Sequence, residues 1–341
     1  MCGICGFVDF DNWDREKALV CLKKMNETLV HRGPDDEGFY IDEYAGLAHK
    51  RLSILDLSGH GRQPMPNEDG NVQLVFNGEI YNFLELRQEM IKKGHSFISK
   101  TDSEVIVHLY EEFGEECFKM LDGMFALAIW DRERKKLFLA RDPIGKKPLH
   151  YAVIGNALLF GSEIKSVLKH PMVGHHLSTD SLCEYLFLGY IPGPGTVFKD
   201  IKKLAGGHFL VFDRDGCRVK QYWDLSCPGQ DSTGEEEAVQ RFMELFRKSV
   251  EKRLMADVPI GVFLSGGIDS SCVALLMAQL SRETIKTFSI GFEDDSYDEL
   301  KFAREMARLT NSDHHEEVLN SGRMLEVLPS VIKGLDEPLA D

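Results

Sequence analysis

The chain has 341 residues, 43% of them hydrophobic and 28% charged, and its net charge is −15 at pH 7. This length predicts about two domains, and the negative charge argues against a nucleic-acid partner. The longest apolar runs, such as residues 124–130, are too short to cross a bilayer, so we expect neither a membrane partner nor a signal peptide. The eight cysteines are scattered without a paired zinc motif, which predicts a reducing, cytoplasmic environment.

Cys2 becomes the N-terminal residue once the initiator methionine is removed, which its small side chain permits. A terminal cysteine carries its own base, because the α-amino pKa of roughly 7.7–8.0 lies close to the thiol pKa of about 8.5. Position two alone would favour a buried structural cysteine next to Cys5. The motifs that follow favour a nucleophile instead.

Hydrophobic periodicity places the elements of the first half. An amphipathic helix over residues 15–29 ends at the glycine–proline turn of residues 31–35. Arg51 lies on a strand over residues 46–55, and a strand over residues 72–76 runs into the segment Asn77-Gly78-Glu79. Further helices are expected over residues 83–93 and after Thr101-Asp102, where either residue can serve as the cap. Two β-rich runs follow at residues 124–130 and 137–140.

The second half alternates strands and helices after a stretch, residues 223–237, that loses its hydrophobic pattern and resembles a linker. A helix over residues 236–255 carries an apolar stripe that we interpret as core. Strands are expected at residues 260–264, 285–292 and 315–319, with a helix at residues 300–309. This alternation predicts a parallel doubly wound sheet with ligands at the carboxyl ends of its strands.

A glycine loop, Ser265-Gly266-Gly267, joins the strand at residues 260–264 to a helix that Asp269 or Ser270 can cap. Free backbone N–H groups and the helix dipole converge at such a junction, which makes it an anion site. The lysine of the Walker loop is absent. The alternative is an ordinary strand-to-helix turn, and we favour the phosphate site.

Several motifs together resemble a known family. Met-Cys-Gly-Ile-Cys-Gly-Phe, His-Arg-Gly-Pro-Asp, Arg-Leu-Ser-Ile-Leu-Asp, Phe-Asn-Gly-Glu-Ile-Tyr-Asn and Thr-Asp-Ser-Glu occur in this order and resemble the class-II glutamine amidotransferase domain. Followed by Ser-Gly-Gly-Ile-Asp-Ser, the whole chain resembles glutamine-hydrolysing asparagine synthetase. The implied fold is an N-terminal-nucleophile α/β/β/α sandwich followed by a partial doubly wound, parallel-sheet adenylating domain. Residues 140–149 resemble a family segment that packs the two domains together.

The resemblance implies a glutamine site in the first domain. Its cysteine would attack the side-chain amide, two donors would stabilise the oxyanion, and charged groups would hold the α-carboxylate and α-ammonium. For two of these residues another reading stays open: Asp102 as a helix cap only, and Glu79 as a solvated turn residue. In the order of these roles the residues are Cys2 as nucleophile, Asn77 and Gly78 as oxyanion donors, Arg51 for the carboxylate, and Glu79 and Asp102 for the ammonium.

The resemblance also implies an ATP site with Mg²⁺ in the second domain. Asp269 would ligate the magnesium ion, because hard oxygen ligands and substrate phosphates suit it. The residues expected to bind ATP are Leu264, Ser265, Gly266, Gly267, Asp269, Ser270 and Ile290.

The expected domains are an amidotransferase domain over residues 2–225, a linker over residues 226–235, and the N-terminal part of a synthetase domain over residues 236–341. Because family members are longer, the chain resembles a truncated member. The expected activity takes glutamine, aspartate and ATP to asparagine, glutamate, AMP and pyrophosphate. The alternatives are a relative that amidates a different carboxylate, and a noncatalytic binding protein on the same fold. A homodimer is one assembly that the resemblance allows.

Overall fold

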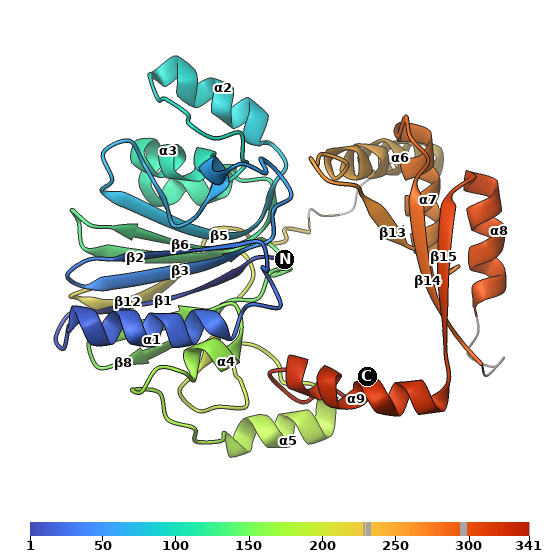
Figure 1. Ribbon diagram of the computed structural model, residues 1–341. Helices are drawn as coiled ribbons and strands as arrows, with labels where there is room; N and C mark the ends of the chain where they lie inside the picture. Colours follow the sequence, from blue (N-terminus) through green and yellow to red (C-terminus); the bar gives the residue numbers. More distant parts are fainter. Residues whose placement is uncertain (228, 230–232, 294–298, 341) are drawn as a thin grey trace. The chain divides into compact units, whose positions relative to one another are not determined.

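The computed structural model describes residues 1–227, 229, 233–293 and 299–340, and the chain forms two compact units (Figure 1). The first unit contains Met1–Ser226 together with the residues from Asp336 onward, and the second spans Cys227–Leu335. Each unit has its own sheets and its own core.

Two six-stranded antiparallel sheets lie at the centre of the first unit. In one sheet the order is β10-β8-β9-β1-β3-β2, so that β1 lies between β9 and β3. The strands of this sheet are β1 (Gly3–Asp9), β2 (Asp36–Ile41), β3 (Ala45–Arg51), β8 (His150–Ile154), β9 (Ala157–Gly161) and β10 (Lys202–Lys203).

The other sheet has the order β12-β11-β7-β6-β5-β4. Its longest strands, β5 and β6, pair along their whole length from Val72 opposite Asp131 to Ile80 opposite Gly123. The strands are β4 (Met65–Pro66), β5 (Val72–Ile80), β6 (Gly123–Asp131), β7 (Lys136–Arg141), β11 (His208–Asp213) and β12 (Gly216–Gln221).

Helices cover the outer faces of both sheets, which gives the α/β/β/α sandwich expected from the sequence (Figure 1). Helices α1 (Arg15–Glu27) and α4 (Ile164–Val167) contribute to the core against the first sheet. Helices α2 (Phe83–Lys93) and α3 (Glu104–Phe113) contribute to the core against the second sheet. The remaining helical segments of this unit are η1 (Gly59–Gly61), η2 (Gly114–Met120) and α5 (Thr179–Leu188).

Alternating side chains explain why most positions of the central strands β1 and β5 are apolar. In β5, Leu74 and Phe76 belong to the core beneath α2 and α3, whereas Val75 belongs to the core between the two sheets. In β1, Ile4 points into that same central core and Cys5 into the core beneath α1. Because successive side chains of a strand point to opposite faces, strands covered on both faces need apolar residues at every position.

The second unit holds a three-stranded parallel sheet, as expected, in the order β13-β14-β15. Its strands are β13 (Gly261–Phe263), β14 (Lys286–Phe292) and β15 (Asp313–Leu319). Its helices are α6 (Glu235–Lys252), α7 (Ile268–Leu280), α8 (Leu300–Thr310) and α9 (Ser321–Gly334). A small core that includes Leu264, Ala274 and Ala303 joins α7 and α8 to the sheet.

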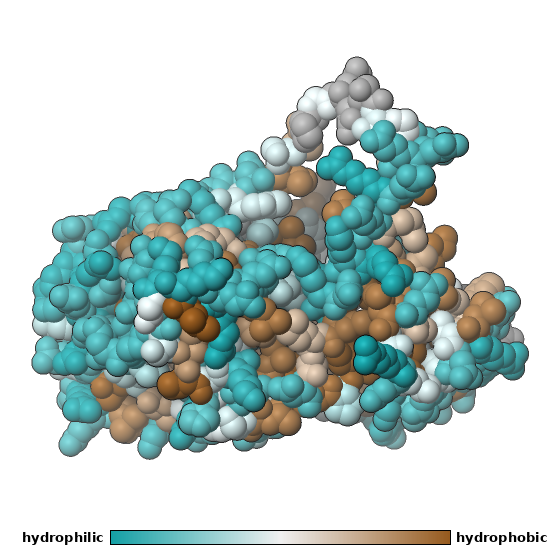
Figure 2. All heavy atoms as spheres, turned by 90° about the horizontal axis from the view of Figure 1, so that it is seen from above, coloured by the Kyte–Doolittle hydropathy of each residue, from teal (hydrophilic) through white to brown (hydrophobic). Residues whose placement is uncertain are grey.

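The apolar stripe predicted as core on α6 is buried only near the end of that helix. Val250 is 7% exposed, whereas Val239 is 54% and Phe242 63% exposed. Only the last turns of α6 join the small core of the second unit, so the prediction was wrong for the first half of the helix. Apolar side chains also reach the surface elsewhere in the second unit, where Phe263 and Ile268 are mostly exposed. Figure 2 shows hydrophobic residues at the surface among hydrophilic ones.

The residues from Asp336 onward, after α9, belong to the first unit, where two of their carboxylates make hydrogen bonds and ion pairs. Asp336 accepts a hydrogen bond from the Ile164 amide, and Glu337 accepts one from the Val197 amide at 2.8 Å. Lys165 lies 3.4 Å from the Asp336 carboxylate and Lys203 lies 2.6 Å from that of Glu337. Two carboxylates with two lysines and two backbone donors therefore hold this segment.

Within the described ranges, none of the helices combines the length and the apolar character that a membrane crossing requires.

Gly33, in the His-Arg-Gly-Pro-Asp turn, passes so close to β3 that no side chain fits. A Cβ at this position would lie 2.3 Å from the carbonyl of Lys50 and 2.6 Å from the amide of Arg51. We expect Gly33→Ala to push the turn off the strand and to lower the free energy of unfolding by about 1–3 kcal/mol, measured by denaturant titration. Gly59→Ala is the matched control, because no atom lies within 4 Å of its added Cβ. Equal stability of the two variants would show that Gly33 does not lie this close to β3.

Candidate active site

Cys2 directly precedes β1, the strand in the middle of the first sheet. Its thiol lies between the backbone groups of Leu52: the Leu52 amide donates to Sγ at 3.4 Å, and Sγ lies 3.7 Å from the Leu52 carbonyl. Burial raises the pKa of the Cys2 thiol. The thiol is therefore positioned by a neighbouring strand and needs a base to become a thiolate.

Arg32 fixes the main chain at the same position, a role that the sequence analysis missed. Its Nε donates to the Cys2 carbonyl at 2.9 Å, and its Nη1 lies 2.8 Å from Glu163. His31 contacts the same Glu163 carboxylate at 3.0 Å. One indication of this role was present in the sequence: His31 and Arg32 belong to the motif that follows the Cys2 motif along the chain.

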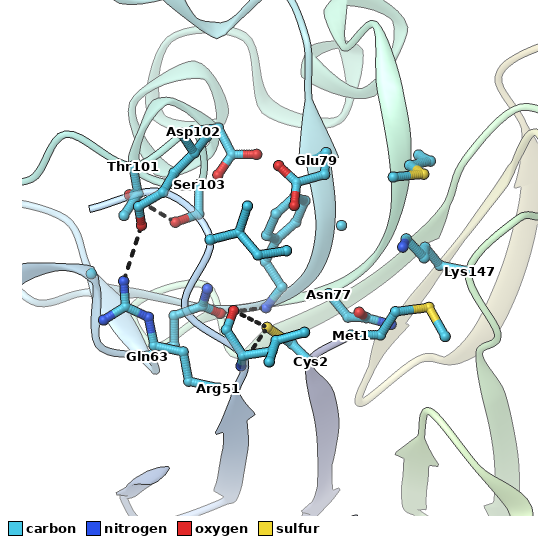
Figure 3. A pocket seen from close by; sticks show the side chains of 17 residues that line it. Met1, Cys2, Arg51, Gln63, Asn77, Glu79, Thr101, Asp102, Ser103 and Lys147 are labelled. Atoms are coloured by element: carbon cyan, nitrogen blue, oxygen red, sulfur yellow. Dashed lines mark hydrogen bonds between the residues drawn. The ribbon is translucent and has the colours of Figure 1, made fainter. Parts of the chain in front are cut away.

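A cavity of about 230 Å³ opens beside Cys2 and is lined by all six residues that the resemblance assigned to glutamine (Figure 3). Pockets for drug-sized ligands usually measure about 300–1,000 Å³, so this cavity suits a ligand of amino-acid size. Cys2 and Arg51 lie toward one end in Figure 3, and the carboxylates of Glu79 and Asp102 approach each other at the other. The six lining residues are Cys2, Arg51, Asn77, Gly78, Glu79 and Asp102.

Asn77 and Gly78 lie near the end of β5. Asn77 is 1% exposed, and its Nδ2 has no hydrogen-bond partner among the described residues. A buried donor without an acceptor is costly, which makes it a candidate for a ligand contact. Gly78 leaves room for the neighbouring strand, because a Cβ here would lie 2.3 Å from the Met124 carbonyl.

Arg51 lines the cavity but also organises the loop that follows β3. Its guanidinium donates to the carbonyls of Ser58 at 2.9 Å and Leu55 at 3.2 Å, and to that of Asp56. Gly61 makes room for it, since a Cβ there would lie 2.0 Å from Arg51 Nη2. The sequence had suggested only a ligand-binding role for this arginine.

The carboxylates of half-buried Glu79 and buried Asp102 both line the cavity. Burial, together with the charge of Asp102, raises the pKa of Glu79 to about 8, and burial raises the pKa of Asp102 to about 6. Lys147 also lines the cavity, and burial lowers its pKa. A bound cation would favour the ionised form of both acids, so the arrangement suits an ammonium group.

Asp102 does not cap helix α3, and the predicted cap at Thr101 or Asp102 was wrong. The helix begins at Glu104 with Ser103 at the capping position and no side-chain cap. Asp102 Oδ2 instead accepts a hydrogen bond at 2.7 Å from the Ile80 amide at the end of β5. This bond ties Asp102 to β5, the strand that carries Glu79. It favours a ligand-binding role for Asp102 over a role as helix cap.

Lys147 and Gln63 are cavity residues that the sequence analysis did not select. The segment containing Lys147 was interpreted as domain packing, yet Asp142 accepts hydrogen bonds from the Lys146 and Lys147 amides and so turns the chain toward the cavity. Gln63 Oε1 accepts a hydrogen bond from the Phe76 amide at 2.6 Å. Neither residue belongs to a motif whose spacing would have indicated it.

The second unit places the predicted phosphate loop between β13 and α7. The hydroxyls of Ser265 and Ser270 lie 2.9 Å apart, and the Gly267 amide donates to the Ser265 hydroxyl at 3.3 Å. Gly266 has φ +85°, and a Cβ there would lie 2.8 Å from Phe302. The loop therefore requires glycine and presents hydroxyls and amides at a helix N-terminus, which fits a pyrophosphate.

The helix cap predicted in this loop was also wrong. Gly267 is the capping residue of α7, and it makes no side-chain bond, so Asp269 and Ser270 lie in the first helical turn. Leu264 is buried, with its amide bonded to the Phe288 carbonyl at 2.8 Å, whereas Ile290 is 60% exposed on β14. Asp269 is the acidic residue of that first turn, so an Mg²⁺ ion here would need phosphate oxygens or water as its further ligands.

The sandwich, the cysteine ahead of its central strand and the acid pair across the cavity define an N-terminal-nucleophile glutamine amidotransferase. Residues 1–223 match the family model described as glutamine amidotransferase domain, and residues 241–341 match that described as asparagine synthase. The chain belongs to the glutamine-hydrolysing asparagine synthetase family.

Curated relatives match almost the whole chain. Asparagine synthetase [glutamine-hydrolyzing] 3 of Bacillus subtilis is 35% identical over 99% of this chain and 57% of its own length. A provisionally named asparagine synthetase of Methanocaldococcus jannaschii is 34% identical over 100% of this chain and 69% of its own. The chain thus spans little more than half the length of the Bacillus subtilis relative.

Solved structures overlap less closely. The Bacillus subtilis glutamine phosphoribosylpyrophosphate amidotransferase, solved with ADP and GMP, is 16% identical, with a TM-score of 0.47 over 92% of this chain and 65% of its own.

The raised pKa of Glu79 predicts a pH-dependent cost in stability. An acid whose pKa is higher in the folded than in the unfolded state loses stability as pH rises from its ordinary value, about 4.5, to its folded value of about 8. We therefore expect Glu79→Gln to raise the melting temperature relative to the unmodified chain, by an amount that grows between pH 5 and pH 8. Glu133→Gln, at an exposed position, is the control. A stability difference that is constant over this range would contradict the assignment.

Proposed function

We propose that the chain carries the glutaminase site and the first phosphate loop of an asparagine synthetase. The observation that carries the proposal is the Nδ2 of buried Asn77 in the cavity beside Cys2, which has no hydrogen-bond partner among the residues that the structure describes. An oxyanion formed during attack on an amide needs such a preset donor. The family membership supports the same reading.

The chemistry begins with the free amine of Cys2 after removal of the methionine. This amine takes the thiol proton, which burial would otherwise retain, and the thiolate attacks the side-chain amide carbon of glutamine. Asn77 Nδ2 and the Gly78 amide donate to the oxyanion. The C–N bond then breaks, the amine returns its proton to the leaving ammonia, and water hydrolyses the thioester to glutamate and regenerates the thiol.

Substrate recognition rests on charge. The α-ammonium of glutamine would lie against Glu79 and Asp102, whose ionised forms burial disfavours until a cation arrives. The α-carboxylate would accept hydrogen bonds from Arg51, which the loop carbonyls of residues 55–58 already orient. Two acids and an arginine match a zwitterion, so simple amides would bind poorly.

In the second unit, Ser265, Ser270 and the amides around Gly267 would orient the pyrophosphate of ATP, and Asp269 would offer an oxygen to Mg²⁺. Bound ATP would activate the acceptor carboxylate for attack by ammonia. We propose aspartate as the acceptor because the relatives are named as asparagine synthetases. An acceptor panel assayed with full-length protein separates this from a relative that amidates another carboxylate. The eight free cysteines favour the reducing cytoplasm as the compartment.

Replacing the nucleophile tests the mechanism. We expect Cys2→Ala to abolish ammonia release from glutamine, and so should a retained N-terminal extension, because it removes the free amine that serves as base. Ammonia and glutamate are measured with a coupled assay. Cys183→Ala, an exposed cysteine on α5, is the control and should retain full activity. Full activity of the extended protein would refute the role of the amine.

The oxyanion donor gives a second, independent prediction. Asn77→Ala should lower kcat for glutamine hydrolysis by about a hundred- to a thousandfold, because the donor acts on the oxyanion rather than on bound glutamine. KM should change little by comparison. Circular dichroism controls for folding, and a variant that retains kcat within a factor of about two would show that Asn77 is not an oxyanion donor.

A further inference from the structure

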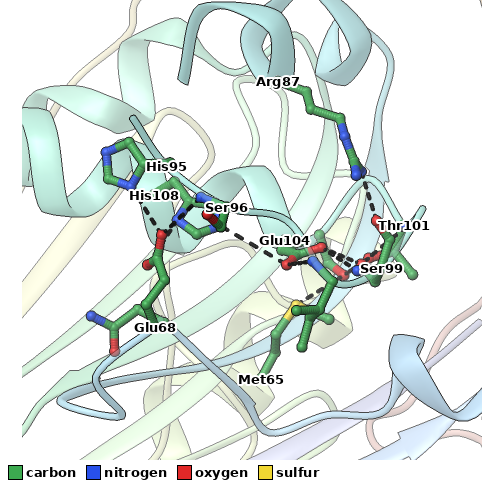
Figure 4. Close-up of polar contacts among 12 residues, drawn as sticks. Met65, Glu68, Arg87, His95, Ser96, Ser99, Thr101, Glu104 and His108 are labelled. Atoms are coloured by element: carbon green, nitrogen blue, oxygen red, sulfur yellow. Dashed lines mark hydrogen bonds and ion pairs between the residues drawn. The ribbon is translucent and has the colours of Figure 1, made fainter. Parts of the chain in front are cut away.

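Four side chains converge outside the glutamine cavity, and the proposed function uses none of them. They are Glu68, His95, His108 and Glu111, and one potential ligand atom from each lies within 4.8 Å of the others. Glu68 precedes β5, His95 follows α2, and His108 and Glu111 lie on successive turns of α3. Figure 4 shows Glu68 directed at both histidines.

The distances match a tetrahedral metal centre. His108 Nδ1 lies 3.2 Å from Glu68 and 3.5 Å from Glu111, while His95 Nδ1 lies 3.4 Å from Glu68 and 3.8 Å from Glu111. Bonds of about 2.0–2.2 Å from a tetrahedral Zn²⁺ ion place neighbouring donor atoms about 3.3–3.6 Å apart. Both histidines therefore aim Nδ1 at the same two carboxylates, at distances of 3.2–3.8 Å that lie around this spacing. His108 faces Oε2 of Glu68 and His95 faces Oε1, so an ion would take one of these two oxygens.

His108 is the buried member and gives independent support. Its side chain is 2% exposed, and neither ring nitrogen makes a hydrogen bond among the described residues. A buried ring nitrogen without a hydrogen-bond partner is costly. A metal ion bound at Nδ1 would satisfy that nitrogen directly.

In metal sites the ligand side chains are usually hydrogen-bonded to further residues outside the metal's own ligands, and some such residues are present here. His95 Nε2 lies 3.3 Å from Glu112, and His108 Nε2 lies 3.9 Å from Glu104. Asn67 Nδ2 donates to the other oxygen of Glu111 at 2.7 Å. His95 thus has a hydrogen-bonded carboxylate behind it and Glu111 is held by an amide, whereas the Glu104 carboxylate lies beyond hydrogen-bond distance of His108.

We propose that Glu68, His95, His108 and Glu111 bind a structural Zn²⁺ ion. Four protein ligands fill a tetrahedral centre and leave no open position, which is typical of structural rather than catalytic zinc. The ion would join the segment after α2 to α3 and to the chain before β5. The same segment is held by Glu104, which accepts hydrogen bonds from the Ile98 and Ser99 amides, both at 2.7 Å, just before Asp102 enters the glutamine cavity.

Metal binding by the full chain is the direct test. After chelator treatment, the protein is titrated with Zn²⁺ against a competing indicator and, separately, with Co²⁺ as a spectroscopic probe. We expect one ion per chain, the intense visible bands of tetrahedral Co²⁺, and a melting temperature about 5–10 °C higher at a free Zn²⁺ concentration of about a hundred times Kd. Absence of stoichiometric binding, or the weak bands of octahedral Co²⁺, would overturn the proposal whatever the variants show.

Variants locate the ion. His95→Gln and Glu68→Gln each remove one ligand at the accessible side of the cluster and should weaken Zn²⁺ affinity by about a hundredfold or more. Glu112→Gln removes only an outer partner and should weaken it by about tenfold. The control is His176→Gln, an exposed histidine outside the cluster. Unchanged affinity in both ligand variants would place the ion elsewhere and refute the site.

Discussion

The placement of Cys2 at the head of β1 is the constraint on which the rest of the first unit depends. A strand paired on both sides and covered on both faces cannot shift its register without breaking two ladders of hydrogen bonds. The residue before such a strand is therefore held as firmly as the strand itself. Leu52 and Arg32 then complete its surroundings from two other segments of the chain.

The cavity is built at a cost in stability. Burial disfavours the ionised forms of half-buried Glu79 and buried Asp102, and the side-chain Nδ2 of Asn77 has no hydrogen-bond partner within the described part of the chain. Each of these features is unfavourable in the folded chain alone and would become favourable on binding of the proposed substrate, a zwitterion with an amide side chain. Local conflict of this kind is expected at a functional site, because the surrounding core enforces the geometry.

The two ends of α3 link the glutamine site to the proposed zinc site. Asp102, just before the helix, bonds to the end of β5, while His108 and Glu111 lie one and two turns into it. Glu104 lies between them and holds the incoming segment through backbone amides. A metal ion at this helix would therefore stabilise one wall of the cavity without contacting the substrate.

The sequence alone determined the family and much of the fold. Six motif residues of the first half line one cavity. The four-layer sandwich agrees with the family resemblance, and the parallel sheet of the second unit agrees with the alternation of strands and helices. Such features are local: a periodic apolar face, or a glycine such as Gly266 that must adopt a positive φ, is visible in neighbouring residues.

Only the tertiary structure decided what depends on residues distant along the chain. The Arg32–Glu163 pair joins residues 131 positions apart, and Asp102 bonds to Ile80 where the sequence suggested a helix cap. The burial of α6 could not be read from its stripe, because periodicity shows which face is apolar but not how much of it another element covers. The cluster around His108 likewise could not be recognised from a motif, because its four residues come from three separate segments of the chain.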